Sequence, residues 1–316
     1  TPSVAAVVGS TDDEFMHFPG SMRLQRSRKE EIVELGDMVK ERLIDWAMKH
    51  LDSDGLPTLP ARMLFYRDGV SESQYAKLRS FEIPQIQKAF NWAQAYLEWC
   101  QAPRPAGVSL DPASNPWPAM MPPPQQPTDD DEVRFVDNTR LNASPVPFQL
   151  TYVVVDKRHN TRFYPTKEAD ITKAYNGSIA NRNVKPGLVV DQVIAHPYSF
   201  DFYLQSHQAV KGTARSAHYF VLQNEMGLTH DQLQQTTHDF CYAYARATKG
   251  VSYCAPAYYA DRLCNRGRCY LRHWVKCRQG NPNQPYRYIR RRNVATGETP
   301  KKYNTIVKDW LRDQPY

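Results

Sequence analysis

The feature that most constrains the fold is an alternation of short apolar segments with longer segments of helical periodicity. Strand-like runs occupy residues 2–10, 22–25, 63–66, 149–156, 189–194, 201–206 and 218–222. Helical patterns lie between several of these runs and after the last of them. A chain that alternates strands and helices buries the apolar faces of a sheet under helices. The sequence therefore predicts a mixed α/β fold with a central sheet flanked by helices.

Two of the expected helices begin at recognisable capping positions. Ser27 with Glu30 predicts a capping box ahead of an apolar helical repeat that starts at Ile32. Thr229 with Gln232 predicts a second capping box in the C-terminal half of the chain.

Prolines indicate two further helix boundaries. The helical pattern from about residue 72 to residue 100 is expected to be interrupted at Pro84. Pro256 suits the first turn of the last long helix, because a backbone N–H has no helical partner at that position.

Two aspartates stand where elements are expected to end or begin. In ARMLFYRDGVSESQ an apolar run ends at Asp68, and in APAYYADRLCNRGRCYL Asp261 precedes an Arg-rich helical stretch. This combination is typical of a metal-dependent nuclease, whose carboxylates bind divalent cations while arginines bind the nucleic acid backbone. Each acid also has a simpler explanation, since Asp-Gly is a common turn and an acid early in a helix is favoured by the helix dipole.

The charge is basic overall and unevenly distributed. The formal net charge is +7 and the sequence pI is about 9.0, which favours an anionic partner without requiring one. Between residues 276 and 302 eight lysines and arginines face one acid, so this segment is either a solvated loop or a phosphate-binding patch. Nine prolines between residues 101 and 127, followed by four acids, indicate an insertion without regular structure.

Several classes of protein and site are not supported by the sequence. No apolar stretch approaches the ~20 residues of a membrane span, and the first residues do not resemble a secretory leader. The six cysteines include no C-x-x-C pair, which disfavours a zinc site and is consistent with reduced thiols. We therefore expect a cytoplasmic or nuclear location and no membrane partner.

Seven segments together resemble the Piwi domain of eukaryotic Argonaute proteins. They occur in the family's order from residue 2 to about residue 275. The segments are PSVAAVVGS, FYRDGVSESQ, VVVDKRHNTRFYP, HPYSFDFYLQSH, KGTARSAHYFVL, YARATKGVSYCAPAYYADR and NRGRCYL. The long insertions, and aspartate rather than histidine at position 261, indicate a fungal Argonaute as the nearest subgroup.

The resemblance implies a fold and a domain organisation. It implies a ribonuclease H-like fold and one Piwi domain over residues 1–316, with a Pro-rich insertion at about 101–132 and a basic insertion at about 276–302. The family's active site is an Asp-Glu-Asp-Asp or Asp-Glu-Asp-His tetrad, whose first aspartate normally lies in a strand just upstream of PSVAAVVGS. The sequence is therefore expected to lack that first strand and to be unable to cleave by itself, although a longer chain that includes it would be complete.

The resemblance also assigns the remaining members of the tetrad. Glu30, Asp68 and Asp261 would be catalytic, and Asp68 and Asp261 would bind metal. Two Mg²⁺ or Mn²⁺ ions are expected in the complete site, with Glu30 orienting the attacking water. The neighbouring Glu31 is an alternative to Glu30, and either acid could be an ordinary helix residue.

Basic and aromatic residues form an implied RNA-binding set. Near the 5′ end of a guide strand the resemblance places Tyr244, Arg246, Lys249, Ser252, Tyr258, Arg266 and Arg268. Nearby backbone contacts would come from Lys157, Arg158, Arg162, His207 and Arg215. Guanidinium groups bind phosphate in a fork, and such contacts follow shape and charge rather than base sequence. Tyr244 and Tyr258 could instead be core aromatics.

Three functions remain open at this point. The leading one is a guide-RNA-directed endonuclease that cleaves a complementary target RNA in RNA silencing. The alternative is a guide-RNA-binding silencing module that never cleaves and acts through partner proteins, for which the family suggests Trp-rich proteins. A nuclease that needs no guide is a more distant third.

Overall fold

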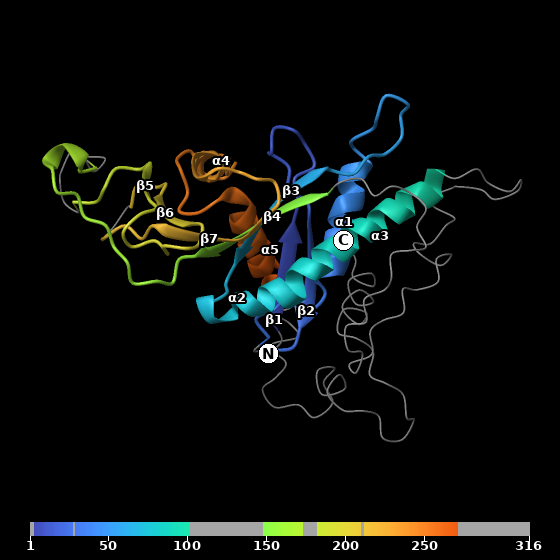
Figure 1. Ribbon diagram of the computed structural model, residues 1–316, viewed down its shortest axis with the longest axis horizontal. Helices are drawn as coiled ribbons and strands as arrows, with labels where there is room; N and C mark the ends of the chain where they lie inside the picture. Colours follow the sequence, from blue (N-terminus) through green and yellow to red (C-terminus); the bar gives the residue numbers. More distant parts are fainter. Residues whose placement is uncertain (1–2, 28, 102–147, 173–181, 210–211, 271–316) are drawn as a thin grey trace, which may run out of the picture.

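The structure is a computed structural model that describes residues 3–27, 29–101, 148–172, 182–209 and 212–270 (Figure 1). Residues 102–132 of the expected Pro-rich insertion and all of the expected basic insertion at 276–302 lie outside the described residues. No helix in the described ranges is long and apolar enough to cross a membrane.

A five-stranded mixed sheet forms the centre of the molecule (Figure 1). Its strands, in spatial order, are β3 (Arg62–Asp68), β4 (Gln149–Asp156), β7 (Ala217–Asn224), β6 (Asp201–Gln205) and β5 (Leu188–Val190). β3 and β4 are parallel, and every other neighbouring pair is antiparallel. A separate antiparallel hairpin consists of β1 (Ser3–Val8) and β2 (Gly20–Gln25).

Helices cover both faces of this sheet. They are α1 (Leu35–Ala47), α2 (Tyr75–Lys77), α3 (Ile83–Gln101), α4 (His230–Tyr242) and α5 (Ala255–Tyr270). Alternate residues of the central strand β4 point to opposite sides: Tyr152 and Val154 pack with α1 and α3, whereas Val153 and Val155 pack with α4 and the start of α5. Because β4 is buried on both faces, its near-continuous apolar run is what a strand covered by helices requires. The predicted mixed α/β architecture is confirmed.

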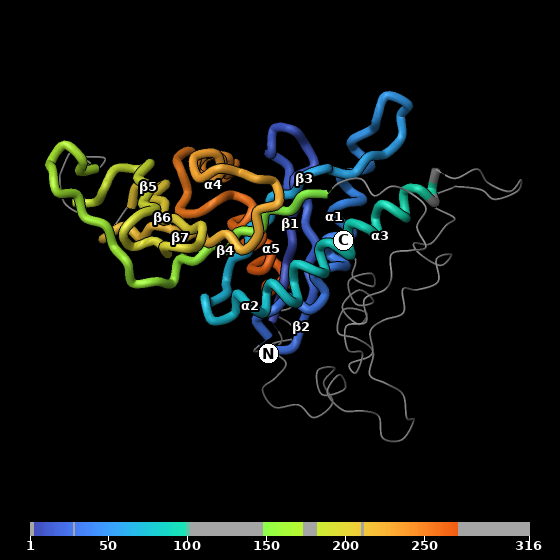
Figure 2. Tube along the Cα trace, viewed as in Figure 1, coloured from blue at the N-terminus to red at the C-terminus, as the bar shows by residue number. Residues whose placement is uncertain are grey.

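Helix α5 is held close to the N-terminal hairpin by small residues. A Cβ on Gly267 would lie 2.5 Å from the Met22 sulfur and 3.3 Å from Val4 Cγ1, so glycine permits this close approach. The thiol of Cys264 also lies 3.5 Å from the Val4 carbonyl oxygen. Figure 2 shows the last described helix lying against the first strands of the chain. This contact between distant parts of the sequence fixes where α5 presents its polar side chains.

Two details differ from the sequence-based prediction. The capping box at Ser27 and Glu30 is wrong, because α1 begins at Leu35 and its N-cap Glu34 makes no side-chain cap. The Gln25 side chain bonds instead to the carbonyls of residues 29 and 31 and to the N–H of residue 33, which keeps this segment out of the helix. The strand expected at 189–194 ends at Val190, since Val193 has a φ of 67°.

The interruption expected in the second helical stretch has a specific form. Leu78–Glu82 is a π-helical turn, and Pro84 is the second residue of α3, in the first turn, where proline is tolerated. The irregular turn therefore precedes the proline, and it includes Glu82.

The second predicted capping box is confirmed. The Thr229 hydroxyl accepts a hydrogen bond from the Gln232 N–H at 3.3 Å, and the Gln232 side chain accepts one from the Thr229 N–H at 3.0 Å. Pro256 also lies in the first turn of α5, as expected.

We expect Thr229→Ala to lower the free energy of unfolding by about 1 kcal/mol, because the Gln232 N–H at the start of α4 would lose its side-chain acceptor. Urea denaturation followed by circular dichroism measures this change. Thr229→Ser keeps the hydroxyl and is the control. An unchanged denaturation midpoint for Thr229→Ala would show that this cap does not stabilise the fold.

Candidate catalytic and nucleic-acid-binding site

Asp68 and Asp261 come together from distant parts of the chain. Asp68 is the last residue of β3, at the edge of the sheet where β4 also ends, and Asp261 lies on α5. Both residues are exposed, but surrounding protein still desolvates Asp68. This desolvation and the neighbouring Asp261 charge raise the pKa of Asp68. The Gly69 N–H and the charges of Arg67 and Arg158 act in the opposite direction but do not outweigh them. The two acids are thus near enough to repel each other.

The position of Asp261 differs from the expected helix start. α5 begins at Ala255, so Asp261 lies inside the helix, and its Oδ2 accepts a hydrogen bond from Asn265 Nδ2 at 3.2 Å one turn later. The helix dipole, which acts mainly in the first turn, therefore gives no reason for an acid at this position.

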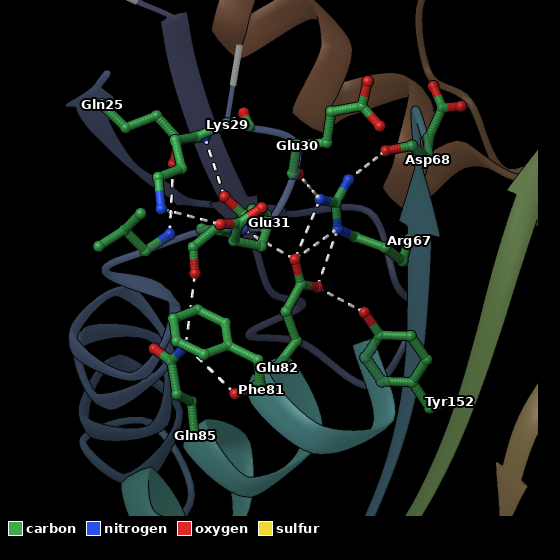
Figure 3. A network of polar contacts seen from close by, with 12 residues as sticks. Gln25, Lys29, Glu30, Glu31, Arg67, Asp68, Phe81, Glu82, Gln85 and Tyr152 are labelled. Carbon is green, nitrogen blue, oxygen red and sulfur yellow. Dashed lines mark hydrogen bonds and ion pairs between the residues drawn. The ribbon is translucent and has the colours of Figure 1, made fainter. Parts of the chain in front are cut away.

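The structure distinguishes the two candidate glutamates near β2. Glu31 is buried and ion-paired with Lys29 at 3.2 Å and Lys77 at 3.0 Å. Burial would raise its pKa, but its own backbone N–H and the two ammonium groups outweigh burial and lower the pKa of Glu31 to about 2. Glu30 is exposed, and Figure 3 shows its carboxylate extending to the same side as that of Asp68. Glu30, not Glu31, is the acid available to a substrate.

The donor set fits a divalent cation that takes part of its coordination from elsewhere. Within residues 3–270, leaving out the gaps given above, no group of three or more His, Cys, Asp or Glu side chains is arranged to hold a metal ion. Mg²⁺ is usually bound by one or two carboxylates together with waters and substrate phosphates. The pair Asp68 and Asp261 meets that requirement, because a cation between them would relieve their repulsion.

A buried ion pair lies directly beneath Glu30 and Asp68 (Figure 3). Arg67 donates from Nε to Glu82 Oε2 at 2.9 Å and from Nη2 to Oε1 at 3.0 Å. Glu82 is fully buried and also accepts a hydrogen bond from the Tyr152 hydroxyl at 2.6 Å. Sequence reasoning missed Glu82 and Tyr152, whose only signal was a charged or hydroxyl group inside an otherwise apolar pattern.

Several of the predicted RNA-binding residues gather beside Asp68. Burial and the charge of Arg215 lower the pKa of Lys157 to about 8, against the opposite effect of Asp68. Burial and Lys157 in turn lower the pKa of His207 to about 4. Lys157 Nζ also lies 5.6 Å from the ring centroid of Tyr253, an aromatic residue that the sequence prediction did not include. This basic cluster stands next to the acidic pair.

Arg162 forms hydrogen bonds within its own loop. Its Nη1 donates to the carbonyl oxygens of His159 at 3.1 Å and Thr161 at 2.6 Å. The guanidinium therefore braces the loop after β4, with its remaining donors left for other partners.

The residues predicted to bind the guide strand near its 5′ end differ in their exposure to solvent. Arg246, Lys249, Arg266 and Arg268 are exposed, whereas Ser252 and Tyr258 are half-buried. The Arg266 guanidinium carbon lies 5.4 Å from the ring centroid of Tyr270, and Arg268 donates to the Asn265 side chain at 3.3 Å.

Tyr244 is a core aromatic residue. It is 4% exposed and packs against the rings of Tyr258 and Tyr259 at centroid distances of 4.6 and 4.8 Å. Its buried hydroxyl makes no hydrogen bond of acceptable geometry to a described residue, although it is near enough to raise the pKa of Arg262. The ring therefore serves the packing of α5.

We expect Asp68→Asn to raise the melting temperature at pH 7 in the absence of divalent cations. The fold raises the pKa of Asp68 above its ordinary value of 3.8, so the ionised carboxylate opposes folding at neutral pH. Below both the folded and the unfolded pKa the group is protonated in either state, and the difference from the wild type vanishes. Melting curves in EDTA at pH 7 and pH 3 measure this dependence.

Glu31→Gln is the matched variant, and we expect it to change the melting temperature at pH 7 in the opposite direction from Asp68→Asn. Because the fold lowers the pKa of Glu31 from 4.5 to about 2, its ion pairs stabilise the fold above pH ~4.5, and this contribution is lost as the pH falls through about 2. The variant should melt lower than the wild type at pH 7, with a smaller difference in acid. Shifts of the same sign for both variants at pH 7 would contradict these charge assignments.

Comparisons with known proteins agree with this architecture. The Piwi domain family model matches residues 1–99 and 131–272. Rice "Protein argonaute 18" is 37% identical over 272 residues, covering 86% of this chain and 20% of the rice protein. Arabidopsis "Protein argonaute 5" is 35% identical, with 86% and 23% coverage. The chain thus spans about a fifth of the length of these relatives. These relatives are plant proteins, so the expected fungal subgroup is not confirmed.

Solved structures of Argonaute proteins share the fold. The C-terminal lobe of a budding yeast Argonaute aligns with a TM-score of 0.63 at 30% identity, over 85% of this chain and 44% of that one. Kluyveromyces polysporus Argonaute with a guide RNA aligns with a TM-score of 0.61 at 28% identity, over 86% and 27%. The fold is ribonuclease H-like, as expected. With the family model matching most of its length, the chain belongs to the Piwi domain family of Argonaute proteins.

Proposed function

We propose that this chain is the nuclease module of a guide-RNA-directed endonuclease that cleaves complementary target RNA. The observation that carries the proposal is the pairing of Asp68 with Asp261 at the open edge of the sheet, next to Lys157 and Arg158. Two like charges side by side oppose folding, so their presence together is best explained by a divalent cation that both would bind. Guide binding is supported by the similar Kluyveromyces polysporus Argonaute, whose structure was solved with a guide RNA.

Each residue has a separate task in this proposal. Asp68 and Asp261 would hold Mg²⁺ or Mn²⁺, which when bound supplies Lewis-acid stabilisation of the charge that develops on the scissile phosphate. Glu30, whose carboxylate faces the same side, orients the attacking water. Lys157 and Arg158 hold the phosphates next to the cleaved bond, and burial of this lysine strengthens its attraction for them.

The exposed arginines of α5 and of the loop before it serve the guide strand. Arg246, Arg266 and Arg268 present guanidinium groups to solvent, and such groups bind phosphate in a fork. A complementary target RNA, a cytoplasmic or nuclear location and docking of Trp-rich silencing proteins are part of the same proposal. A mismatched RNA would load poorly into the site, because contacts to backbone leave the recognition of sequence to base pairing.

Alanine at Asp68 or at Asp261 should abolish cleavage while leaving guide binding intact. Lewis-acid stabilisation contributes several kcal/mol, so the single-turnover rate should fall at least about 100-fold. The assay uses the full natural chain loaded with guide RNA and a matched target, with Mg²⁺ or Mn²⁺ and with EDTA. Asp231→Asn, an exposed acid at the start of α4, is the control.

The outcomes of this assay separate the three functions. Unchanged cleavage in both alanine variants would overturn the proposed metal site. A wild-type protein that binds guide but leaves the target intact with either metal is the non-cleaving silencing module. Cleavage of single-stranded RNA without a guide indicates an unguided nuclease.

Arg266→Ala should weaken guide RNA binding and lower its salt dependence. Each lost phosphate contact on a single strand reduces the slope of log K against log salt concentration by about 0.7. Filter binding across a salt series measures the slope. Arg266→Lys keeps the charge and should keep the slope, so an equal loss in both variants would assign Arg266 a role other than phosphate binding.

A further inference from the structure

The carboxylate of Glu82 is the most enclosed charged group near the site, and the proposed reaction does not use it. Glu82 has no exposed surface, yet both of its oxygens are fully engaged. Oε1 accepts from the Ile32 N–H at 2.8 Å and from Arg67 Nη2 at 3.0 Å, while Oε2 accepts from Arg67 Nε at 2.9 Å and from the Tyr152 hydroxyl at 2.6 Å. This side chain therefore joins an irregular segment, strand β3 and strand β4 at one point.

Stability alone gives a weak reason for such a group. Removing two charges from water is costly, and well-packed apolar residues of similar size often stabilise a fold as well or better. A buried ion pair can also fix the position of other groups that it contacts. The remaining contacts of the Arg67 guanidinium identify those groups.

Arg67 also donates to the backbone of two of the three proposed catalytic acids, Glu30 and Asp68. Nη2 donates to the carbonyl oxygen of Glu30 at 2.6 Å, and Nη1 donates to the carbonyl oxygen of Asp68. In Figure 3 the guanidinium lies between the two acids, whose side chains extend away from it on the same side. One planar group held by Glu82 thus sets the separation of two backbone segments.

Other contacts hold Glu82 itself in place. It ends the π-helical turn before α3, and the next turn supplies Gln85, whose Oε1 accepts from the Gly36 N–H at 3.0 Å. The Tyr152 ring stacks on Phe65 at a centroid distance of 5.1 Å. Burial and the Glu82 charge raise the pKa of Tyr152, so its hydroxyl remains a hydrogen-bond donor. Glu82 therefore has little freedom to move.

We propose that Glu82 is a positioning residue, which acts through Arg67 and the Ile32 N–H to fix Glu30 relative to Asp68. This inference rests on the proposed nuclease function. Glu82 does not reach the open edge of the sheet and touches neither substrate nor cation. Its loss should therefore change the rate of cleavage and leave binding of the guide unchanged.

Glu82→Gln is the direct test, because it keeps the size of the side chain but removes the charge and replaces one acceptor with an N–H₂ group. That group would face either the Ile32 N–H and Arg67 or the Tyr152 hydroxyl and Arg67. A displacement of about 1 Å in a catalytic group can cost about 100-fold in rate. In the full natural chain loaded with guide RNA, we expect a single-turnover rate roughly 10–100-fold lower, with guide affinity within about twofold of the wild type.

Hydrogen exchange provides a readout that does not depend on cleavage. The Ile32 N–H donates to Glu82, so its exchange should accelerate in Glu82→Gln more than exchange in the core strand β4. Tyr152→Phe is the milder second variant: it removes one donor and leaves the ion pair, and it should slow cleavage severalfold if Glu82→Gln fails to fold.

Asp201→Asn is the matched control. Asp201 of strand β6 is another buried acid, 3% exposed, which accepts from the His196 N–H at 2.8 Å and pairs with His218 of strand β7 at 2.7 Å. All variants are assayed below their melting temperatures. The control should lose stability as Glu82→Gln does, yet cleave like the wild type once folded.

The results separate this inference from the function on which it rests. Slow cleavage and faster Ile32 exchange in Glu82→Gln, with normal cleavage in Asp201→Asn, support the positioning role. Normal cleavage by folded Glu82→Gln or Tyr152→Phe overturns it and leaves the nuclease proposal intact. Equal slowing in Asp201→Asn would assign Glu82 a merely structural role. A wild-type protein that does not cleave overturns both proposals.

Discussion

The parallel pairing of β3 with β4 is the constraint on which the site depends. In this register Asp68 lies beside Val155, so the end of β3 and the residues that follow β4 reach the same edge of the sheet. Lys157 and Arg158 come directly after β4 and therefore stand next to Asp68. An antiparallel pair would place them at opposite ends. Ligands of open α/β sheets commonly bind at the carboxyl ends of parallel strands, for this reason.

Charge at this edge is arranged for a ligand more than for stability. Burial and Asp261 raise the pKa of Asp68, burial and Arg215 lower that of Lys157, and burial and Lys157 lower that of His207. In each case the surroundings disfavour the charged form. Groups perturbed in this direction gather at functional sites, where a bound ligand offsets the cost. A bound cation would stabilise the ionised form of the acids, and a bound phosphate would stabilise the charged form of Lys157. The ion pair of Glu82 beneath them differs, because each carboxylate oxygen accepts hydrogen bonds from groups inside the protein and needs no ligand.

Local patterns predicted much of the fold. The apolar run of β4 was located to the residue, and the capping box at Thr229 was predicted from two side chains three residues apart. Such signals are local, because a strand buried on both faces and a helix start each need only neighbouring residues. The cap predicted at Ser27 was wrong because a side chain from β2, Gln25, competes for the same backbone groups. Tyr244 had two readings in the sequence, and only packing against α5 shows that its ring is buried.

From the chain alone one can infer the alternation of strands and helices, the resemblance to the Piwi domain and the residue types available for a nuclease. These follow from side-chain periodicity and from motifs that are contiguous in the chain. Three features required the folded structure: Glu30 is exposed on the side of Asp68 whereas Glu31 is buried, Asp261 lies inside a helix close to Asp68, and Glu82 bonds both Arg67 and the Ile32 N–H. The physical reason is that burial, repulsion and shared hydrogen bonds depend on distances between segments that are far apart in sequence. Periodicity contains no information about those distances.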